Sequence, residues 1–89
     1  MARNNNYAQE ISKLIGNKIY FLRCRKGLSR YELSKNINIT YQQLKKYEKG
    51  INQISTGRLV LIARELGKKV SYFYEDLEAK DSIQLHNKI

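Results

Sequence analysis

The sequence predicts an all-α fold of five helices and no strands. Apolar residues recur at intervals of three and four positions along most of the chain, which is the period of an amphipathic helix. Serine or threonine residues precede several of these segments, where a hydroxyl can cap the first turn of a helix. Proline is absent from the 89 residues, so no helix is interrupted by it. This length allows one small domain that buries only about 60 to 65 per cent of its unfolded surface, so we expect dimerisation to add stability.

The first helix is expected to begin near Tyr7 and to be stopped by Gly27. Its core-facing stripe consists of Ile11, Leu14, Ile15, Ile19 and Leu22. These positions follow the three-and-four spacing, and glycine commonly stands directly after the end of a helix. Residues 1–6 are mostly polar, so we predict a flexible lead before the domain, which spans residues 7–77.

Two short helices joined by a tight turn are predicted within residues 28–50. Ser29 can cap the first of them, with Glu32 in the capping-box position three residues later. Thr40 can cap the second. Asn38 lies in the turn, and asparagine is the non-glycine residue that best tolerates the left-handed conformation such a turn needs. One continuous amphipathic helix is the alternative, which the two caps and Asn38 disfavour.

A fourth helix and a short fifth helix complete the predicted domain. The connector before the fourth helix is rich in Asn, Gln, Ser, Thr and Gly, as a loop should be, and Ser55 or Thr56 can cap the helix. Its core stripe consists of Leu59, Ile62, Ala63 and Leu66, with Gly67 at its end. Ser71 can open the fifth helix, which carries Phe73. Residues 78–89 are predicted to form a loosely ordered tail.

The positive charge of the chain is unevenly distributed. The net charge is +9 and the pI is near 9.8, which suits a polyanionic partner. Residues 18–50 hold nine Lys or Arg against two acids, whereas residues 71–89 hold four acids against two lysines. The charge therefore coincides with the two short helices and indicates a nucleic-acid surface. A general solvated basic surface, as many small basic proteins have, is the alternative.

Several classes of function are disfavoured by what the sequence lacks. Cys24 is the only cysteine, which excludes a disulfide within the chain and cannot make a metal site alone. His86 is the only histidine, and neither a cysteine nor a carboxylate cluster accompanies it, so we predict no enzyme and no metal or cofactor site. No apolar run approaches the roughly 20 residues of a membrane span, and the start lacks the apolar core of a signal peptide. We expect a cytoplasmic protein with no membrane partner and no evident small-molecule ligand.

The order of these features resembles the Cro/CI type of helix-turn-helix domain, also called the XRE family, over about residues 11–77. The matching residues are Ile15, Ile19, Leu22, Arg23, Gly27, Leu28, Ser29, Leu33, Ser34, Asn38, Tyr47, Glu48, Lys49 and Gly50, followed by Leu59, Ile62, Ala63, Leu66, Gly67, Val70 and Phe73. The resemblance implies a compact lambda-repressor-like fold that binds double-stranded DNA as a homodimer. It also implies a structural ion pair between Arg23 and Glu48, which would tie the first helix to the end of the third.

Contacts with DNA bases are expected from the second helix of the motif, about residues 40–49. In helix-turn-helix proteins this helix lies in the major groove, and its N-terminal residues meet the base edges. The candidate base-contacting residues are Tyr41, Gln42, Gln43, Lys45 and Lys46. Gln42 is the strongest candidate, because its amide can donate to and accept from one adenine at the same time.

Contacts with DNA phosphates are expected on either side of this helix. The candidates are Ser29, Arg30, Asn52, Gln53, Ser55, Thr56 and Arg58. Ser29 and Arg30 begin a helix whose positive dipole end attracts phosphate, and Arg30 adds a full charge. Members of the family more often have Gln at the place of Arg30, where it braces its neighbours, so the sequence does not predict that bracing here.

These features together predict a sequence-specific transcriptional regulator that acts as a repressor. The alternative is a protein-binding module, either an antitoxin that masks a toxin or a factor that touches the transcription machinery. The candidate contacts for a homodimer are Val60, Leu61, Tyr72 and Tyr74, although ordinary packing under the tail would explain the same residues. Two subunits would bind half-sites about 34 Å apart on the DNA.

Overall fold

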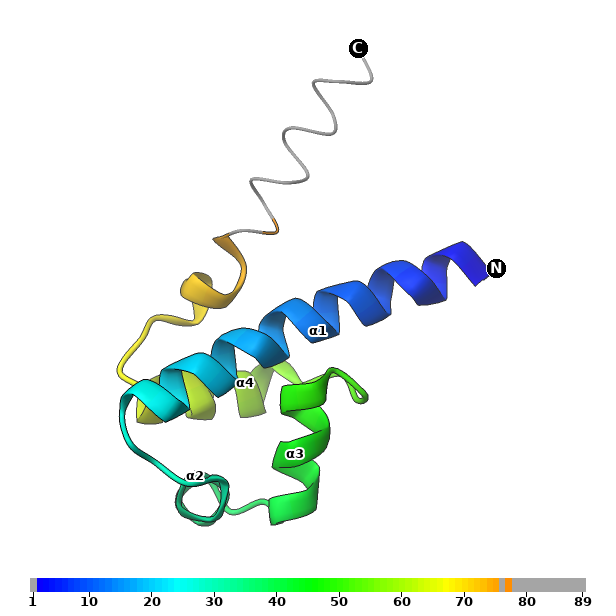
Figure 1. Ribbon diagram of the computed structural model, residues 1–89. Helices are drawn as coiled ribbons and strands as arrows, with labels where there is room; N and C mark the ends of the chain where they lie inside the picture. Colours follow the sequence, from blue (N-terminus) through cyan, green and yellow to red (C-terminus); the bar gives the residue numbers. More distant parts are fainter. Residues whose placement is uncertain (1, 76, 78–89) are drawn as a thin grey trace.

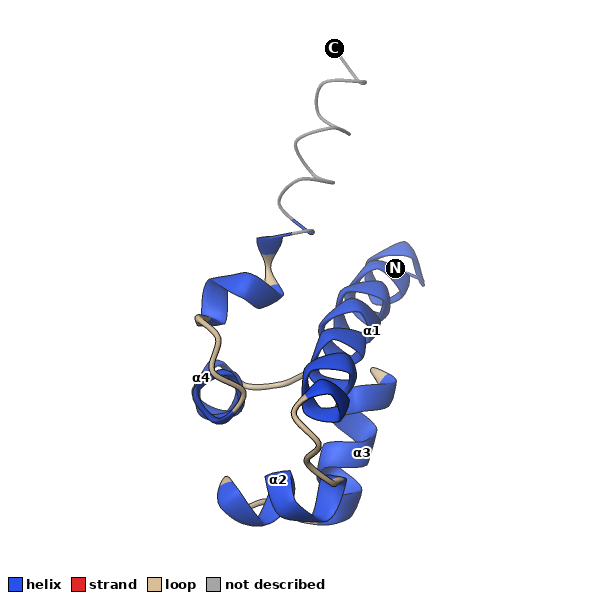
Figure 2. Cartoon of the chain, turned by 60° about the vertical axis from the view of Figure 1, so that its left-hand side comes forward, coloured by secondary structure: helices blue, strands red, loops and turns tan. Residues whose placement is uncertain are grey.

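Four α-helices and one 3-10 turn follow one another in the computed structural model, which describes residues 2–75 and 77. The elements are α1 (Ala2–Arg25), α2 (Arg30–Asn36), α3 (Tyr41–Lys49), α4 (Thr56–Glu65) and the 3-10 turn η1 (Val70–Phe73). No strand occurs among the described residues, and the predicted all-α class is confirmed. Figure 1 shows α1 lying across the other helices, and Figure 2 shows α4 end-on beside it, with α2 and α3 below.

The first helix is longer than the sequence predicted. It begins at Ala2, so the backbone of residues 2–6, where we expected a flexible lead, continues α1. Asparagine has a modest helix propensity, but a helix that is already nucleated and packed gains one hydrogen bond for each residue added at its end. The predicted tail, residues 78–89, lies outside the described residues.

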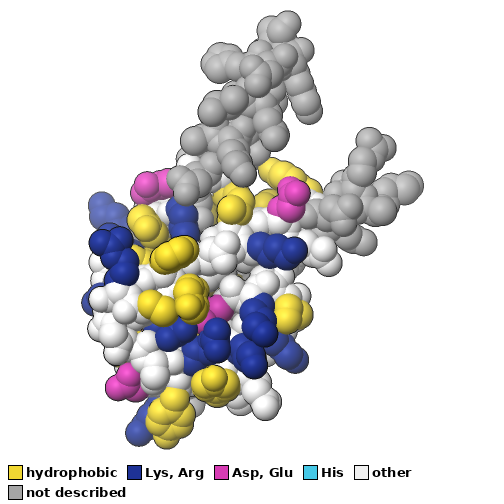
Figure 3. Space-filling model, viewed as in Figure 1, with side chains coloured by type: hydrophobic (Ala, Val, Ile, Leu, Met, Phe, Trp, Pro, Cys, Tyr) yellow, Lys and Arg dark blue, Asp and Glu magenta, His cyan; other side chains and the backbone are white. Residues whose placement is uncertain are grey.

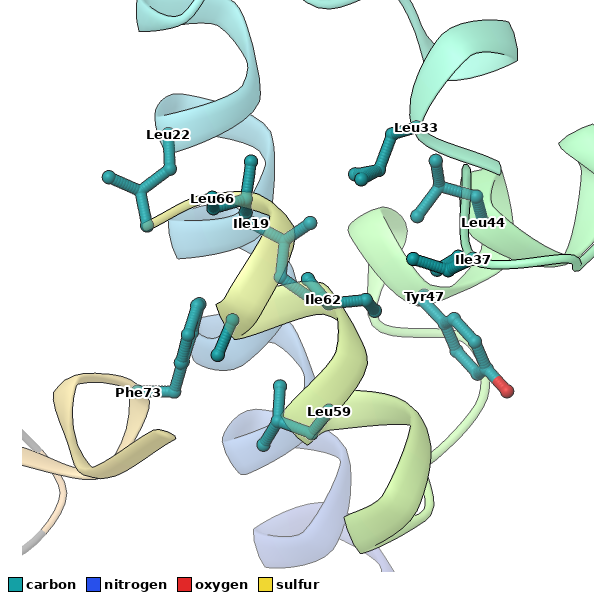
Figure 4. Close-up of a cluster of buried hydrophobic side chains, with 11 residues drawn as sticks. Ile19, Leu22, Leu33, Ile37, Leu44, Tyr47, Leu59, Ile62, Leu66 and Phe73 are labelled. Atoms are coloured by element: carbon teal, nitrogen blue, oxygen red, sulfur yellow. The ribbon is translucent and has the colours of Figure 1, made fainter. Parts of the chain in front are cut away.

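The hydrophobic core joins all five elements. Its largest fully buried side chains are Phe73, Ile19, Leu33, Leu44, Leu59, Ile62 and Leu66. Figure 4 shows Ile19 of α1 beside Ile62 and Leu66, with Phe73 closing one side of the cluster. The stripes that the sequence predicted on α1 and α4 therefore meet each other in the core, α1 through Ile15, Ile19 and Leu22. Ile11 and Leu14, also predicted to face the core, do not belong to this cluster.

Local capping places α2 and α3 as the sequence predicted. Ser29 Oγ accepts from the backbone N–H of Glu32 at 3.0 Å, while the Ser29 N–H donates to a Glu32 carboxylate oxygen at 2.8 Å. Thr40 Oγ1 accepts from the N–H of Gln43 at 3.0 Å and caps α3. Asn38 has the expected left-handed backbone, with φ of 61°. The Ser29 and Thr40 caps begin α2 and α3, and Asn38 lies in the short turn that joins them, which is the geometry of a helix-turn-helix.

The predicted fifth helix is wrong in its type and in its cap. The N–H of Tyr72 donates to the carbonyl oxygen of Lys69 at 3.0 Å, three residues back, which makes η1 a 3-10 turn. The residue before the turn is Lys69, so Ser71 lies inside it. Val70 and Phe73 both pack against the core, and a spacing of three residues puts them on one side of a 3-10 turn.

A glycine that the sequence analysis did not single out lets α3 approach α1. A Cβ atom at Gly16 would lie 2.6 Å from the carbonyl oxygen of Glu48 and closer still to that of Tyr47. Only glycine permits two backbones to come this near. Near the end of α3, a Cβ atom at Gly50 would lie 2.6 Å from the Cα atom of Lys13. The backbone of α1 therefore fixes where α3 lies.

Candidate nucleic-acid interface

One side of α3 faces solvent because Leu44, Tyr47 and Glu48 are buried on the other side. The residues that line one shallow hollow on the exposed side are Gln42, Lys45, Lys46, Lys49 and Ile51. We call these five residues the α3 face. The hollow is mostly apolar, because the aliphatic stems of long side chains cover surface while their charged ends reach the water. Three of the five predicted base-contacting residues are thus brought together.

The other two predicted base-contacting residues lie at the edges of the α3 face. Tyr41 begins α3 and is exposed. Gln43 is half-buried and belongs to a different hollow of about 350 Å³. The lining of that hollow consists of Asn38, Ile39, Thr40, Gln43 and Arg58. Gln43 therefore shares a hollow with Arg58 of α4 and does not line the α3 face.

Arg58, in the first turn of α4, is held in place by a residue of α3. Its Nη1 donates to the Tyr47 hydroxyl at 2.7 Å. The Tyr47 ring is buried, and Figure 4 shows its hydroxyl pointing away from the cluster of apolar side chains. This bond orients the guanidinium at the hollow beside the N-terminus of α3. The sequence predicted Arg58 as a phosphate contact but gave no sign of its tie to Tyr47.

Three charged side chains from α1, α2 and α3 form one ion cluster. Arg23 Nε donates to Glu48 Oε2 at 2.6 Å, and Arg23 Nη2 donates to Oε1 at 3.1 Å. Arg30 Nε donates to the same Oε1 at 2.8 Å. Arg23 Nη1 also donates to the carbonyl oxygen of Leu28 at 2.8 Å. One carboxylate is shared by two guanidinium groups, so the ion cluster of Arg23, Glu48 and Arg30 carries one net positive charge.

The members of the ion cluster differ in exposure. The side chains of Arg23 and Glu48 are 8% and 2% exposed, whereas that of Arg30 is 23% exposed. The hydrogen bond with Glu48 raises the pKa of Arg23 and outweighs the effect of burial, which lowers it. Hydrogen bonding with Glu48, and then with Tyr41, raises the pKa of Arg30. Both arginines therefore stay charged, and Arg30 does brace α2 against α3, which the sequence did not predict.

The two serines among the predicted phosphate contacts serve as helix caps. Ser29 exchanges two bonds with Glu32, so its own N–H is not free for phosphate. Ser55 Oγ accepts from the N–H of Arg58 at 3.2 Å. Thr56 follows at the start of α4 and is exposed. Of the predicted phosphate contacts Ser29, Ser55, Thr56 and Arg58, only Arg58 has a charged side chain.

The loop after α3 lies beside the N-terminal half of α1. Gln53 is exposed and Asn52 is half-buried. The residues that line a further hollow here are Ala8, Gln9, Ser12, Gly50, Ile51 and Gln53. The structure thus adds polar side chains of α1 to the surroundings of a predicted phosphate contact.

Few acidic side chains reach the surface around α2 and α3, where most charged side chains are basic. Of the two acids in residues 18–50, Glu48 is buried in the ion cluster and Glu32 is engaged in the capping box. Figure 3 shows Lys and Arg side chains over much of this face, including its lower part, where α2 and α3 lie in Figure 1, with hydrophobic side chains among them. A polyanion would be attracted to this side.

Two residues of the α3 face were missed by the sequence analysis. Lys49 lies seven positions after Gln42 and four after Lys45, a spacing that puts all three on one side of a helix. That signal was available in the sequence. Ile51 is 64% exposed, and its position depends on the path of the chain after Gly50, which no local pattern gives.

The four predicted dimer contacts do not form one free apolar patch. Leu61 is 40% exposed, whereas Val60, Tyr72 and Tyr74 are half-buried. The Tyr72 ring lies 4.6 Å from Lys18 Nζ and 5.0 Å from Lys68 Nζ, and its carbonyl oxygen accepts from Lys18 Nζ at 2.8 Å. Tyr72 and Tyr74 also pack against the core. Packing within the domain thus engages two of the four, and the homodimer stays a prediction.

Three further features of the described part of the chain concern membrane spans, metal binding and the cysteine. None of its helices has the length and apolar character needed to cross a membrane. Its Cys, Asp and Glu side chains form no group of three or more that could hold a metal ion, and His86 lies outside the described residues. Cys24, which lies on the outer side of α1, is exposed.

Comparison with known proteins agrees with this geometry. Residues 19–73 match the family model of a helix-turn-helix domain. An HTH-type transcriptional regulator of Rickettsia conorii is 54% identical over 84 residues, which are 94% of this chain and 67% of that protein. A regulator of the same type from Rickettsia prowazekii is also 54% identical over 84 residues, or 94% of this chain and 65% of that protein. The chain thus spans about two thirds of the length of these relatives.

The fold is shared with a solved regulator of much lower sequence identity. The crystal structure of the clp gene regulator ClgR from Corynebacterium glutamicum superposes with a TM-score of 0.72 at 19% identity. The superposition covers 88% of this chain and 83% of that one. Fold and motif together define a helix-turn-helix DNA-binding domain. The chain belongs to the helix-turn-helix family, and within it to the XRE type of transcriptional regulator.

Proposed function

We propose that the protein is a sequence-specific repressor that binds double-stranded DNA as a homodimer and reads the major groove with α3. The observation that carries the proposal is the α3 face, where one glutamine and three lysines share an exposed surface. Its opposite side is buried, so α3 has one fixed orientation on the domain. The HTH-type transcriptional regulators among its relatives support the same class.

The residue types on the α3 face suit the chemistry of base edges. The Gln42 amide can donate to N7 of adenine and accept from its N6 amino group in one bidentate pair, which discriminates by about 1 to 3 kcal/mol. Lys46 can donate to guanine O6 and N7. The exposed Ile51 offers an apolar contact for a thymine methyl group, and Tyr41 can do the same at the start of the helix. Sequence choice would thus come from a few side chains on one helix.

Two arginines on opposite sides of the α3 face would position the protein on the DNA backbone. Arg30 lies at the start of α2 and is bonded to Glu48, while Arg58 lies in the first turn of α4 and is bonded to Tyr47. About half to two-thirds of protein–DNA hydrogen bonds go to phosphate or sugar, and such contacts set register without reading sequence. Each arginine is anchored to a residue of α3, so the phosphate contacts and the base contacts would keep a fixed spacing.

A homodimer would read two half-sites about 34 Å apart, and its operator would be close to palindromic. A protein bound across a promoter prevents the polymerase from occupying it, so repression follows from tight binding alone. The half-buried Val60 and the exposed Leu61 are the remaining apolar candidates for the contact between subunits.

The test is a gel-shift titration with the DNA upstream of the protein's own gene and a scrambled duplex of equal length. The proposal predicts much tighter binding to the upstream DNA, and the logarithm of the affinity should fall with log salt by about 0.9 for each phosphate neutralised. Gln42→Ala should reduce the preference between the two duplexes. Asn17→Ala, at an exposed position on the outer side of α1, is the matched control and should leave it unchanged.

Three outcomes would contradict parts of the proposal. Equal binding to both duplexes would contradict sequence-specific reading. Failure to bind either duplex would contradict DNA binding and favour a protein-binding module, such as an antitoxin. A promoter fused to a reporter should lose expression when the protein is present, and a gain of expression would contradict the repressor role.

A further inference from the structure

Arg30 is a half-buried arginine whose Nε is held by a buried carboxylate. Its Nε donates to Glu48 Oε1 at 2.8 Å, and Glu48 is only 2% exposed, so the acceptor is held by the protein core. A free surface arginine loses rotamer freedom when it binds a phosphate, and this loss opposes binding. Part of that freedom is already lost when this domain folds.

The bond to Glu48 leaves most of the Arg30 donors for other acceptors. A guanidinium carries five N–H donors, and Glu48 engages only the one on Nε. The pair of Nη groups can bind two oxygens of a phosphate side by side, which is the strong bidentate geometry. The buried Arg23 balances the charge of Glu48. The net positive charge of the ion cluster is therefore left on Arg30, which is its most exposed member.

We propose that Glu48 is a positioning residue for DNA binding as well as a part of the fold: it holds Arg30 in the orientation that binds a phosphate. The inference rests on the proposed function, because the phosphate belongs to the DNA that the α3 face reads. Arg30 is also close enough to Tyr41 for the two to interact, so Glu48 would tie a phosphate contact to the first residue of α3. The family more often has glutamine at position 30. Here Arg30 places a positive charge there that is held by Glu48.

The proposal is tested by a double-mutant cycle on DNA affinity. The four proteins are the wild type, Glu48→Gln, Arg30→Ala and the double variant, each compared at equal concentrations of folded protein. Glu48→Gln keeps the size of the side chain and removes its charge, which by simple electrostatics should strengthen binding to a polyanion. We expect the opposite, because Arg30 keeps its charge but loses its fixed orientation. The affinity of Glu48→Gln for DNA should fall by about three- to tenfold, while the slope of log affinity against log salt stays unchanged.

The second half of the cycle separates positioning from folding. Arg30→Ala should weaken binding to upstream and scrambled DNA alike and reduce the salt slope by about 0.9. In that background, Glu48→Gln should cause no further loss. An equal loss in both backgrounds, or unchanged or tighter binding of Glu48→Gln alone, would overturn the proposal. If the wild type binds no DNA, the proposed function fails first and is recognised before any variant is compared.

A second variant keeps the proposal testable if Glu48→Gln does not fold. Arg30→Lys preserves the charge at the surface, but an ammonium on a flexible stem cannot bond Glu48 and a phosphate as a guanidinium does. Its affinity should fall by about three- to tenfold, with the salt slope of the wild type. Arg25→Lys, at an exposed position at the end of α1, is the control and should bind as the wild type does. Wild-type affinity of Arg30→Lys would overturn the proposal.

Discussion

Gly16 of α1 and Glu48 of α3 are so close that one methyl group would not fit between them. A Cβ atom at Gly16 would lie 2.6 Å from the Glu48 carbonyl oxygen, which belongs to the backbone and cannot rotate away. The same Glu48 carries the carboxylate that binds Arg23 and Arg30. A single residue of α3 thus fixes the helix to α1 through its backbone and to α1 and α2 through its side chain.

Gly16→Ala should lower the free energy of unfolding by about 1 to 3 kcal/mol, because α1 and α3 would have to move apart. Chemical denaturation measures the change. Gly57→Ala is the matched control, since nothing lies within 4 Å of the position of its Cβ atom and it lies in α4. It should leave stability unchanged or raise it by up to about 1 kcal/mol, as alanine does in a helix. Equal losses in both variants would contradict this account of the close approach.

Glu48→Ala and Gln42→Ala should separate the fold from the reading of DNA. Removing Glu48 leaves the guanidinium of Arg23 buried without its partner, so stability should fall by about 3 to 5 kcal/mol, enough to loosen or unfold a domain of this size. Gln42 is exposed, so its replacement should leave the melting curve nearly unchanged while the preference for the operator falls. Thermal melting of the two variants measures their stability. Equal losses of stability would contradict the assignment of Glu48 to the fold and of Gln42 to the reading of DNA.

The turn between α2 and α3 should prefer glycine to alanine at position 38. Asn38 has φ of 61°, which alanine adopts at a cost and glycine adopts freely. Asn38→Ala should therefore lower the free energy of unfolding by about 1 kcal/mol, whereas Asn38→Gly should not lower it. Asn17→Ala is the control for the same substitution inside a helix and should be neutral or stabilising. Equal effects of alanine and glycine at position 38 would show that the backbone there is not constrained.

The parts of the fold that depend on neighbouring residues could be predicted from the sequence. The capping box of Ser29 and Glu32, the Thr40 cap and the left-handed Asn38 each involve residues within a few positions of one another. The amphipathic stripes of α1 and α4 follow from helical spacing alone. These local signals were sufficient for the fold class and for the solvent side of α3.

Relationships between distant residues could not be predicted in the same way. Arg30 meets Glu48 across eighteen positions, and Tyr47 meets Arg58 across eleven. The approach of Gly16 to α3 depends on how two helices cross. The 3-10 form of η1 is decided by packing of Val70 and Phe73 on the core rather than by a capping residue, which is why Ser71 misled the prediction.

Arg58 should contribute one phosphate contact to DNA binding. Arg58→Ala should weaken binding to all duplexes by a similar factor and reduce the slope of log affinity against log salt by about 0.9. Arg64→Ala, at an exposed position near the other end of α4, is the matched control and should leave the slope unchanged. Titrations at several salt concentrations provide the slopes. The same slope for Arg58→Ala and the wild type would exclude a phosphate contact at this residue.

The central claim, that α3 reads base edges in the major groove, is tested most directly with modified bases in the operator. Replacing adenines of a half-site by 7-deazaadenine removes N7 from the major groove, whereas replacing guanines by inosine removes a donor from the minor groove only. The measurement is the affinity of the wild type and of Gln42→Ala for both modified duplexes. We predict that 7-deazaadenine weakens binding of the wild type by about tenfold or more and has little effect on Gln42→Ala. Unchanged affinity for the 7-deazaadenine duplex together with a loss on the inosine duplex would contradict the claim.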